Sequence, residues 1–581
     1  MNIFKDLMWF FKSEKKSYIG GIFILALVSL GQLIPPKVVG QLVDHMREDT
    51  LTERMLISYG SLLLGIAAVI YVLRFLWRIF IFGAAVRLSL LLRKKLYDHF
   101  TKQSSEFYQK RRVGDLMAHS TNDLQAIQQT AGDGVLTLVD SLMVGGFTLI
   151  AMATTISWKL TLISLIPMPF MAYATSRYGT MLHKRFHAAQ EAFSSLNDKV
   201  QESISGSRVI KAFGQEEHDS AAFKELSADA VRKNMAVAKV DSLFDPTISL
   251  IVGFSFFLAV SFGAFFVVQG EMSLGDLVSF TAYLGLLIWP MLAFGWLFNI
   301  VERGRASYDR VMKLLGTEEV IRDNGVKTAI SAGDIMFRLE EFRYQKDRIP
   351  ALKDITFNLK EGQTLGITGK TGSGKTTLCR LLMREYDTGE GSIFLGELDI
   401  ASFTNESVKK LISYVPQDHF LFSASIRENI AFSKYDAPFL DVKEAAERAA
   451  VHEDIAAFKE GYETVVGERG VMLSGGQKQR ISIARALLHG GDVLILDDSL
   501  SAVDAKTEEK ILNSLKTIRS GKTTVITAHR LSSIAHADWI IVLDEGRAVQ
   551  QGTHEQLKSD EGWYKDTLQR QALESLIAQG G

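Results

Sequence analysis

Residues 369–376 read Gly369-Lys370-Thr371-Gly372-Ser373-Gly374-Lys375-Thr376, which is the phosphate-binding pattern GxxxxGKT. The apolar run 364–367 before them predicts a buried strand, and 377–382 after them predicts a helix. Backbone N–H groups of such a loop bind phosphates at a helix N-terminus, while Lys375 adds a positive charge and Thr376 offers a hydroxyl to Mg²⁺. The stretch therefore predicts an α/β domain that binds ATP.

A second element about 120 residues later carries a carboxylate. Residues 493–496 form a short apolar run that ends in Asp497, a pattern typical of a parallel strand. A carboxylate at the C-terminal end of such a strand can hold Mg²⁺ opposite the phosphate loop. An apolar run followed by Asp is a weak signal by itself. It gains weight from Leu473-Ser474-Gly475-Gly476-Gln477, just before a predicted helix at 479–488.

With these residues the second half of the chain resembles the ATP-binding cassette (ABC) family of P-loop ATPases, whose signature LSGGQ is unchanged at 473–477. The resemblance implies that Gln417 senses Mg²⁺ and the attacking water, that Asp504 belongs to the D-loop 501–504, and that His529 is the switch histidine. It also implies that Tyr344 stacks on adenine, with a surface tyrosine beside a strand as the alternative. Residues 467–470 resemble the exporter-specific loop that touches the membrane domain.

The resemblance assigns binding roles residue by residue. ATP contacts are expected at Tyr344, Gly369, Lys370, Thr371, Gly372, Ser373, Gly374, Lys375, Thr376 and Thr377, and from the signature and D-loop at Ser474, Gly475, Gly476, Gln477 and Asp504. Mg²⁺ is expected at Thr376, Gln417 and Asp497, and catalytic roles at Asp498, His529 and Gln417.

Asp498 departs from the family pattern, which places a glutamate directly after the metal-binding aspartate. Its side chain is one methylene shorter, and a shortfall of ~1 Å in a positioning group can cost about 10²-fold in rate. Family cassettes pair head to tail, so each ATP lies between the phosphate loop of one chain and the signature of the other. The resemblance thus implies a heterodimer with a second ABC half-transporter: Lys375, Asp497, Asp498 and His529 form a degenerate site, and the intact signature completes the partner's active one. The alternative is a homodimer in which Asp498 suffices.

The first half of the chain carries six long stretches without a formal charge. Their lengths of 17 to 25 residues suit membrane-spanning helices better than core helices, which are usually shorter and amphipathic. The stretches are 17–36, 55–73, 141–158, 160–176, 246–270 and 277–301.

Lys and Arg counts set the orientation of these spans. Segments 85–133 and 177–241 carry 8 and 10, whereas 37–54, residue 159 and 271–276 carry 3, 1 and 0. By the positive-inside rule the two long segments and the N-terminus face the cytoplasm. Six crossings return the chain to the side where ATP is available. The first apolar stretch lacks a small-residue cleavage site and is long enough to remain as a span.

A length of 581 residues fits one membrane domain and one cassette. We expect a six-helix exporter-type transmembrane domain with two intracellular loops at 1–310, a linker at 311–335, and an ABC nucleotide-binding domain at 336–575. Coupling helices are expected near 114–117 and 205–208. The net charge of −1 gives no indication of nucleic-acid binding, and DNA-repair and chromosome-organising ATPases with LSGGQ carry long coiled coils that this sequence lacks.

The closer resemblance, carried by 114–118, 415–419 and 496–501, is to the degenerate-site subunit of bacterial heterodimeric multidrug exporters. It implies alternating-access efflux of small amphipathic or hydrophobic compounds across the cell membrane, in contact with membrane lipid. A lipid or peptide exporter of the same fold would share every motif. A channel or regulator gated by ATP is an alternative of a different class, because it would bind ATP without coupling turnover to transport.

Overall fold

The computed structural model describes residues 3–317, 325–328, 333–344, 349–388, 392–467 and 473–580. It divides into two compact units. The first consists of Met1–Lys102 and Tyr108–Glu318, and the second of Gln103–Phe107 and Glu319–Gly581.

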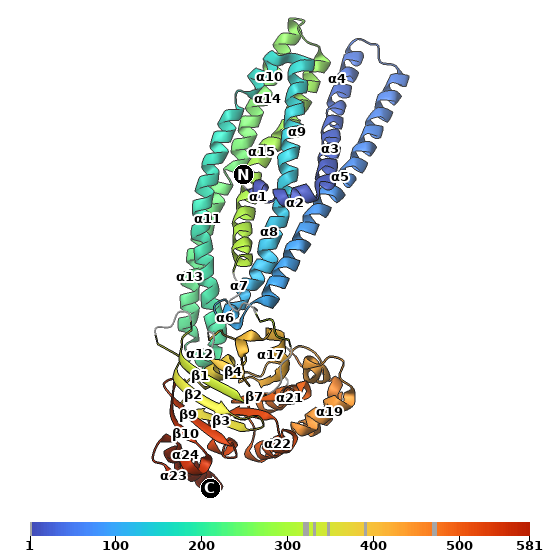
Figure 1. Ribbon diagram of the computed structural model, residues 1–581. Coiled ribbons are helices and arrows are strands. Elements are labelled where there is room, and N and C mark those ends of the chain that lie inside the picture. The colour runs from blue at the N-terminus through green and yellow to red at the C-terminus, as the bar shows by residue number, and fades with distance from the viewer. Residues whose placement is uncertain are drawn as a thin grey trace. The chain divides into compact units, whose positions relative to one another are not determined.

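The first unit is helical throughout its described elements (Figure 1). Turns of π-helix at 119–123, 130–134 and 152–157 connect the helices between α7 and α10. The helices up to residue 315, of which α6 is divided between the two units, are α1 (Ile3–Asp6), α2 (Met8–Ser13), α3 (Lys15–Gly31), α4 (Ile34–Arg47), α5 (Glu53–Lys102), α6 (Ser105–Gln109), α7 (Val113–Ala118), α8 (Leu124–Gln129), α9 (Val135–Ala151), α10 (Trp158–Leu165), α11 (Met168–Ser205), α12 (Ser207–Ala212), α13 (Glu216–Asp241), α14 (Phe244–Val268) and α15 (Leu274–Leu315).

Five stretches of the described helices are long and apolar enough to cross a membrane: Lys15–Arg47, Glu53–Lys102, Val113–Leu165, Glu216–Val268 and Leu274–Leu315. The fourth predicted span, 160–176, is divided between α10 and α11 at Pro167. Proline lacks the N–H that a continuous helix needs, so the break has a local cause. Ser157, in an extended conformation, begins α10 by accepting a hydrogen bond from the Leu160 N–H at 3.3 Å.

Two glycines let α4 and α15 approach closely. A Cβ atom at Gly275 would lie 2.1 Å from the Gly40 carbonyl oxygen, so only glycine fits. Asp44 on α4 accepts hydrogen bonds from Ser273 Oγ at 2.6 Å and from the Gly275 N–H at 2.7 Å. The carboxylate therefore caps the N-terminus of α15, where unpaired N–H groups and the helix dipole favour an anion.

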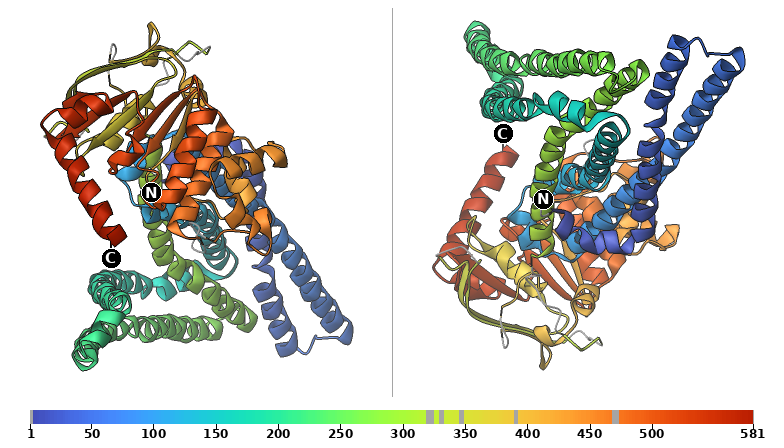
Figure 2. Two further views of the ribbon diagram at one scale, coloured as in Figure 1. Left: turned by 90° about the horizontal axis from the view of Figure 1, so that it is seen from below. Right: turned by 90° about the horizontal axis from the view of Figure 1, so that it is seen from above.

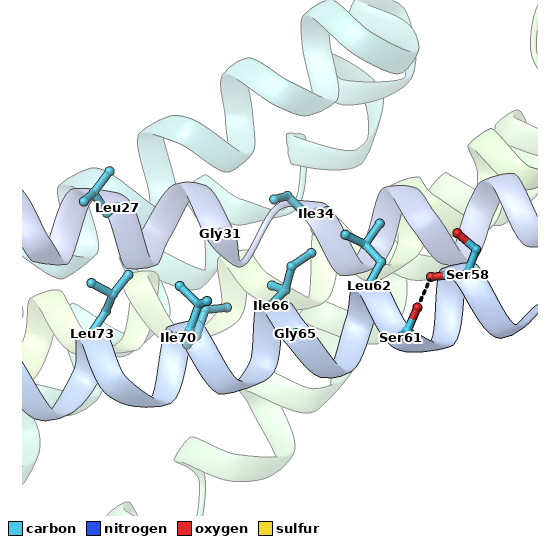
Figure 3. Close-up of a pocket in the computed structure, with 11 residues that line it drawn as sticks. Leu27, Gly31, Ile34, Ser58, Ser61, Leu62, Gly65, Ile66, Ile70 and Leu73 are labelled. Carbon is cyan, nitrogen blue, oxygen red and sulfur yellow. Dashed lines mark hydrogen bonds between the residues drawn. The ribbon is translucent and has the colours of Figure 1, made fainter.

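A groove of about 520 Å³ lies between α3, α4 and α5 (Figure 3). Its walls are mainly aliphatic, and Gly31 and Gly65 leave space between the helices. The Ser61 hydroxyl donates back to the Ser58 carbonyl at 2.9 Å, which satisfies this polar group within its own helix. Figure 2 shows α3, α4 and α5 from two further sides as one hairpin.

The second unit contains two β-sheets. One has the order β2-β1-β4-β5 and the other β10-β9-β3-β8-β7-β6. In the larger sheet β3 pairs in parallel with β8 and β9, and β7 pairs in parallel with β6 and β8, whereas β9 and β10 are antiparallel. The strands are β1 (Ile335–Phe342), β2 (Leu352–Leu359), β3 (Thr364–Gly369), β4 (Ile393–Leu395), β5 (Leu398–Asp399), β6 (Ile412–Val415), β7 (Val493–Asp497), β8 (Thr523–Thr527), β9 (Trp539–Asp544) and β10 (Arg547–Gly552).

Burial explains the composition of the central strands. All five residues of β7 and of β8 are buried, because helices cover a parallel sheet on its faces.

The α-helices described from residue 375 onward are α16 (Lys375–Leu382), α17 (Asn405–Leu411), α18 (Ile426–Ile430), α19 (Phe439–Arg448), α20 (His452–Ala456), α21 (Gly475–His489), α22 (Ala505–Ile518), α23 (His554–Ser559) and α24 (Trp563–Gly580).

The segment Gln103–Phe107 groups with the second unit, although its neighbours on both sides belong to the first. Within that unit, burial raises the pKa of the Glu385 carboxyl, while the charge of Arg380 and a hydrogen bond from Ser105 oppose that rise. The predicted coupling position at 114–117 instead lies in α7 of the first unit. α7 is a short helix of six residues, so the coupling position near 114–117 stays a prediction.

Candidate nucleotide-binding site

The phosphate loop connects β3 to α16 through three glycines with positive φ. Gly369, Gly372 and Gly374 have φ of 142°, 81° and 102°. A Cβ atom at Gly369 would lie 2.0 Å from the Leu543 carbonyl oxygen, and one at Gly374 would lie 2.5 Å from Leu352 Cδ2. Glycine is therefore needed at both positions for backbone conformation and for space. The loop ends at the N-terminus of α16, which favours bound anions.

Lys375 is buried at the start of α16 and its amino group faces the loop. Nζ donates to the carbonyl oxygens of Gly369 and Lys370, each at 2.9 Å. Burial lowers the pKa of the Lys375 amino group, while Asp498 and Asp497 oppose that shift. Ser373 Oγ is buried and has no hydrogen-bond partner within the described residues. A loop with a buried cation and an unpaired hydroxyl suits a phosphate ligand.

Thr376 and Asp497 meet beside the loop. Thr376 Oγ1 donates to Asp497 Oδ1 at 3.2 Å, which brings together two of the three residues predicted to hold Mg²⁺. Asp497 is fully buried, and it also accepts from Thr527 Oγ1 at 2.8 Å and from the Tyr414 hydroxyl at 3.3 Å. Mg²⁺ prefers oxygen ligands and is usually bound by one or two carboxylates with substrate phosphates. This donor set fits that requirement.

Asp498 follows the end of β7 in a left-handed conformation, with φ of 46°. Its backbone N–H donates to Thr527 Oγ1 at 2.8 Å, and Gln417 Nε2 approaches its Oδ2 only to 3.5 Å. Burial raises the pKa of the Asp498 carboxyl, against the effect of nearby His529. The third predicted Mg²⁺ residue, Gln417, therefore lies on the side of Asp498 rather than within hydrogen-bond distance of Asp497.

Tyr344 lies beside the phosphate loop, and its ring packs against the ring of Tyr386. Its hydroxyl donates to Thr377 Oγ1 at 3.0 Å, and its ring meets that of Tyr386 edge to face with centroids 5.1 Å apart. The structure thus places the predicted adenine-stacking residue at the site. Lys370, also predicted to contact ATP, forms an ion pair with Asp544 at 2.9 Å.

The signature begins α21 as a helix cap. The Ser474 side chain accepts from the Gln477 N–H at 3.2 Å, and Gln477 Oε1 accepts from the Ser474 N–H at 3.1 Å. Gln477 Nε2 then donates to Asp454 Oδ1 at 3.1 Å. Asp504 likewise caps α22 by accepting a hydrogen bond from the Thr507 N–H, and hydrogen bonds from the Thr507 side chain and backbone lower the pKa of the Asp504 carboxyl.

Within the described part of the chain, no hydrogen bond joins Ser474, Gly475, Gly476 or Gln477 to the phosphate loop. The structure therefore brings together the phosphate loop, Asp497, Asp498, Gln417 and Tyr344, and leaves the signature apart from them. The exporter-specific loop predicted at 467–470 lies outside the described residues from 468 onward.

Two residues of the site were not predicted from the sequence. Thr527 bonds both Asp497 and Asp498, and Tyr414 bonds Asp497. Each ends or lies within a strand next to β7, and the parallel register pairs Thr527 with Asp497. In the sequence, Thr527 is marked only by lying two residues before His529, the predicted switch histidine, and Tyr414 only by lying three residues before Gln417.

Comparisons with known proteins agree with this geometry. The family described as ABC transporter transmembrane region matches residues 18–291, and the family described as ABC transporter matches residues 352–501. The chain is 46% identical over 577 residues to the multidrug resistance-like ATP-binding protein MdlA of Escherichia coli (strain K12), covering 99% of this chain and 98% of that protein. It is 46% identical over 573 residues to the probable multidrug resistance ABC transporter ATP-binding/permease protein YheI of Bacillus subtilis (strain 168), covering 98% of each. A bacterial Atm1-family ABC exporter solved with ATP bound matches with a TM-score of 0.79 and 26% identity, over 96% of this chain and 98% of that one.

Proposed function

This chain belongs to the ABC transporter family, and we propose that it is the degenerate-site half of a heterodimeric exporter of amphipathic or hydrophobic compounds. It is an ATP-hydrolysing transporter of the exporter type, a multi-pass membrane protein with a cytoplasmic nucleotide-binding domain. We assign the transmembrane domain to 1–310, the linker to 311–335 and the nucleotide-binding domain to 336–575.

The observation that carries the proposal is the carboxylate at position 498. A base that activates water must reach it at a hydrogen-bonding distance. Asp498 carries one methylene fewer than the glutamate that the family places here, and its backbone is held with φ of 46°, so its carboxylate falls short of the position that a glutamate would reach. This chain's own phosphate loop, Lys375, Asp497 and His529 would then bind ATP with slow turnover.

The signature supports the other half of the proposal. Its Ser474–Gln477 cap is complete, and Asp454 and Arg480 hold it from α20 and α21. A complete signature, in a chain whose own phosphate-loop site turns over slowly, is what such a chain needs to complete a competent site in a partner. We therefore propose that a second ABC half-transporter supplies the active carboxylate.

Exposed apolar side chains on each unit support pairing. In the first unit, Ile204, Val209 and Phe213 surround the turn between α11 and α12 and are 70%, 61% and 75% exposed. In the second, Phe422 and Phe432 stack on each other beside Arg485 and are more than a third exposed. Exposed apolar groups of this kind mark interaction surfaces. We propose that the α11–α12 turn of each half-transporter is the second coupling element and docks on the partner's cassette.

The substrate class is supported by the relatives. Both proteins that are 46% identical over the whole chain carry multidrug-resistance names. Because their likeness includes the membrane unit, we propose that this chain exports small drug-like compounds.

The test is to tag this chain, purify it gently from its native membrane and identify its companion by intact-mass analysis. A stoichiometric second ABC half-transporter, with a glutamate after its Walker aspartate, is the expected result. Recovery of this chain only as a self-pair with ATPase activity would mean that Asp498 is a working base. Dye and labelled-lipid flux by the recovered pair would then separate drug export from lipid export, and ATP turnover without movement of either would favour a regulator.

A further inference from the structure

The C-terminal helix α24 reaches the turn of the switch histidine through one side chain. Gln571 Nε2 donates to the His529 carbonyl oxygen at 2.9 Å, and Gln571 Oε1 accepts from the Leu531 N–H at 2.9 Å. A primary amide carries a donor and an acceptor in one plane, so a single side chain can bind both sides of a backbone turn. Figure 2 shows α24 as the red helix that carries the C-terminus.

The helix is anchored so that Gln571 faces this turn. Tyr564, Thr567, Leu568 and Gln571 follow the spacing of one helical face. Tyr564 is fully buried and its hydroxyl bonds His554 Nδ1 at 2.8 Å, while Leu568 packs against the hydrophobic core of the domain. The buried part of this face therefore fixes the position of its last member.

The turn is held from a second direction by α22. Arg530, between the two backbone groups that Gln571 binds, forms an ion pair with buried Glu508 at 3.2 Å. Ser533 Oγ also donates to Glu508. Glu508 thus fixes side chains of the segment, whereas Gln571 fixes the backbone on both sides of Arg530.

We infer that Gln571 is a positioning residue for His529, and that α24 thereby sets how this chain's own site retains ATP. The inference rests on the proposed role of His529 at that site. Without the amide, the His529 carbonyl and the Leu531 N–H lose their partner, and the turn gains freedom to move. Two hydrogen bonds correspond to about tenfold or more in the equilibrium for opening such a turn.

The experiment uses the full paired complex in lipid and two measurements. Hydrogen exchange of the peptide that contains 528–531 reports the contact itself. Photolabelling of this chain by radioactive 8-azido-ATP with Mg²⁺, after free nucleotide is removed, reports retention at its own site. The variants are Gln571→Ala, Gln571→Glu and His529→Ala, and Gln569→Ala is the matched control because Gln569 is exposed on the same helix.

We expect Gln571→Ala to speed exchange and to lower ATP retention about tenfold, with Gln569→Ala unchanged. Gln571→Glu keeps the oxygen that accepts from the Leu531 N–H and removes the donor to the His529 carbonyl. A loss of ATP retention in Gln571→Glu would therefore show that the hydrogen bond to His529 is responsible, and not a failure of α24 to fold. Unchanged exchange in Gln571→Ala, or an equal loss in Gln569→Ala, would overturn the inference. If ATP retention is lost in His529→Ala but kept in Gln571→Ala, the positioning role of Gln571 is wrong and the role proposed for His529 stands. If retention is kept in both variants, the role proposed for His529 is refuted.

Discussion

Replacing Asp498 by glutamate should restore turnover at this chain's own site. Gln417 Nε2 lies 3.5 Å from Asp498 Oδ2, at the outer limit of a hydrogen bond. One added methylene extends the carboxylate by about 1.5 Å. Since ~1 Å in the position of a catalytic group changes the rate about 10²-fold, Asp498→Glu should raise hydrolysis at this site by up to about 10²-fold.

The backbone opposes this gain to a small extent. Asp498 has φ of 46°, a region that Asp and Asn tolerate better than longer side chains. We therefore expect Asp498→Glu to cost about 1 kcal/mol of stability, which is too little to unfold the domain. Asp498→Asn is the matched control, because it keeps the shape and the tolerance for positive φ and removes the carboxylate.

The assay is ATP hydrolysis by the purified pair in which the partner's catalytic glutamate is changed to glutamine, so that only this chain's site can turn over. Faster hydrolysis with glutamate at 498, and none with asparagine, is the expected pattern. No gain from Asp498→Glu would refute the argument from reach. Equal, large losses when either chain alone loses its carboxylate would refute the asymmetry.

Ser474→Phe should reduce ATP turnover of the pair more than Lys375→Ala, because Ser474 caps the signature that we propose completes the partner's site. Steady-state hydrolysis compares the two variants, and the reverse order would contradict the assignment. Gly374→Ala should abolish ATP binding by this chain, since Gly374 has φ of 102° and an added Cβ would lie 2.5 Å from Leu352, which displaces the phosphate loop. Photolabelling by 8-azido-ATP measures this binding, and normal labelling would contradict the need for glycine at this position. Because the pKa of Asp498 is raised, the folded state favours the neutral carboxyl, and the stability that this group contributes is present below the ordinary Asp pKa and is lost as pH rises through the raised pKa. Over that pH interval, the unfolding temperature of wild type should fall relative to that of Asp498→Asn. Parallel curves of unfolding temperature against pH would contradict this prediction.

The fold class was predictable because its signals are local. A glycine loop between strand and helix, and apolar stretches long enough to cross a bilayer, are written in consecutive residues. Both predictions are confirmed: the chain is a helical membrane domain fused to an ABC nucleotide-binding domain. The division of the fourth span at Pro167 was less clear from hydropathy, which averages over the break.

The site was predictable only where a motif carries the residue. Asp497 and Thr376 are 121 residues apart, and the motifs suffice to place them together. Thr527 and Tyr414 belong to two strands, and the sequence of a single strand does not reveal which strands lie next to it in the sheet. Their bonds to Asp497 depend on β6 and β8 lying on either side of β7.

The sequence by itself therefore determined the two domains, the ATPase chemistry and the short carboxylate at 498, because each depends on neighbouring residues. Tertiary structure alone decided that Gln417 reaches Asp498 only at 3.5 Å, that Gln103–Phe107 joins the second unit, and that Gln571 binds the turn of His529. The physical reason is that hydrogen bonds act over about 3 Å, so residues 40 or more positions apart interact only after packing fixes where each backbone runs.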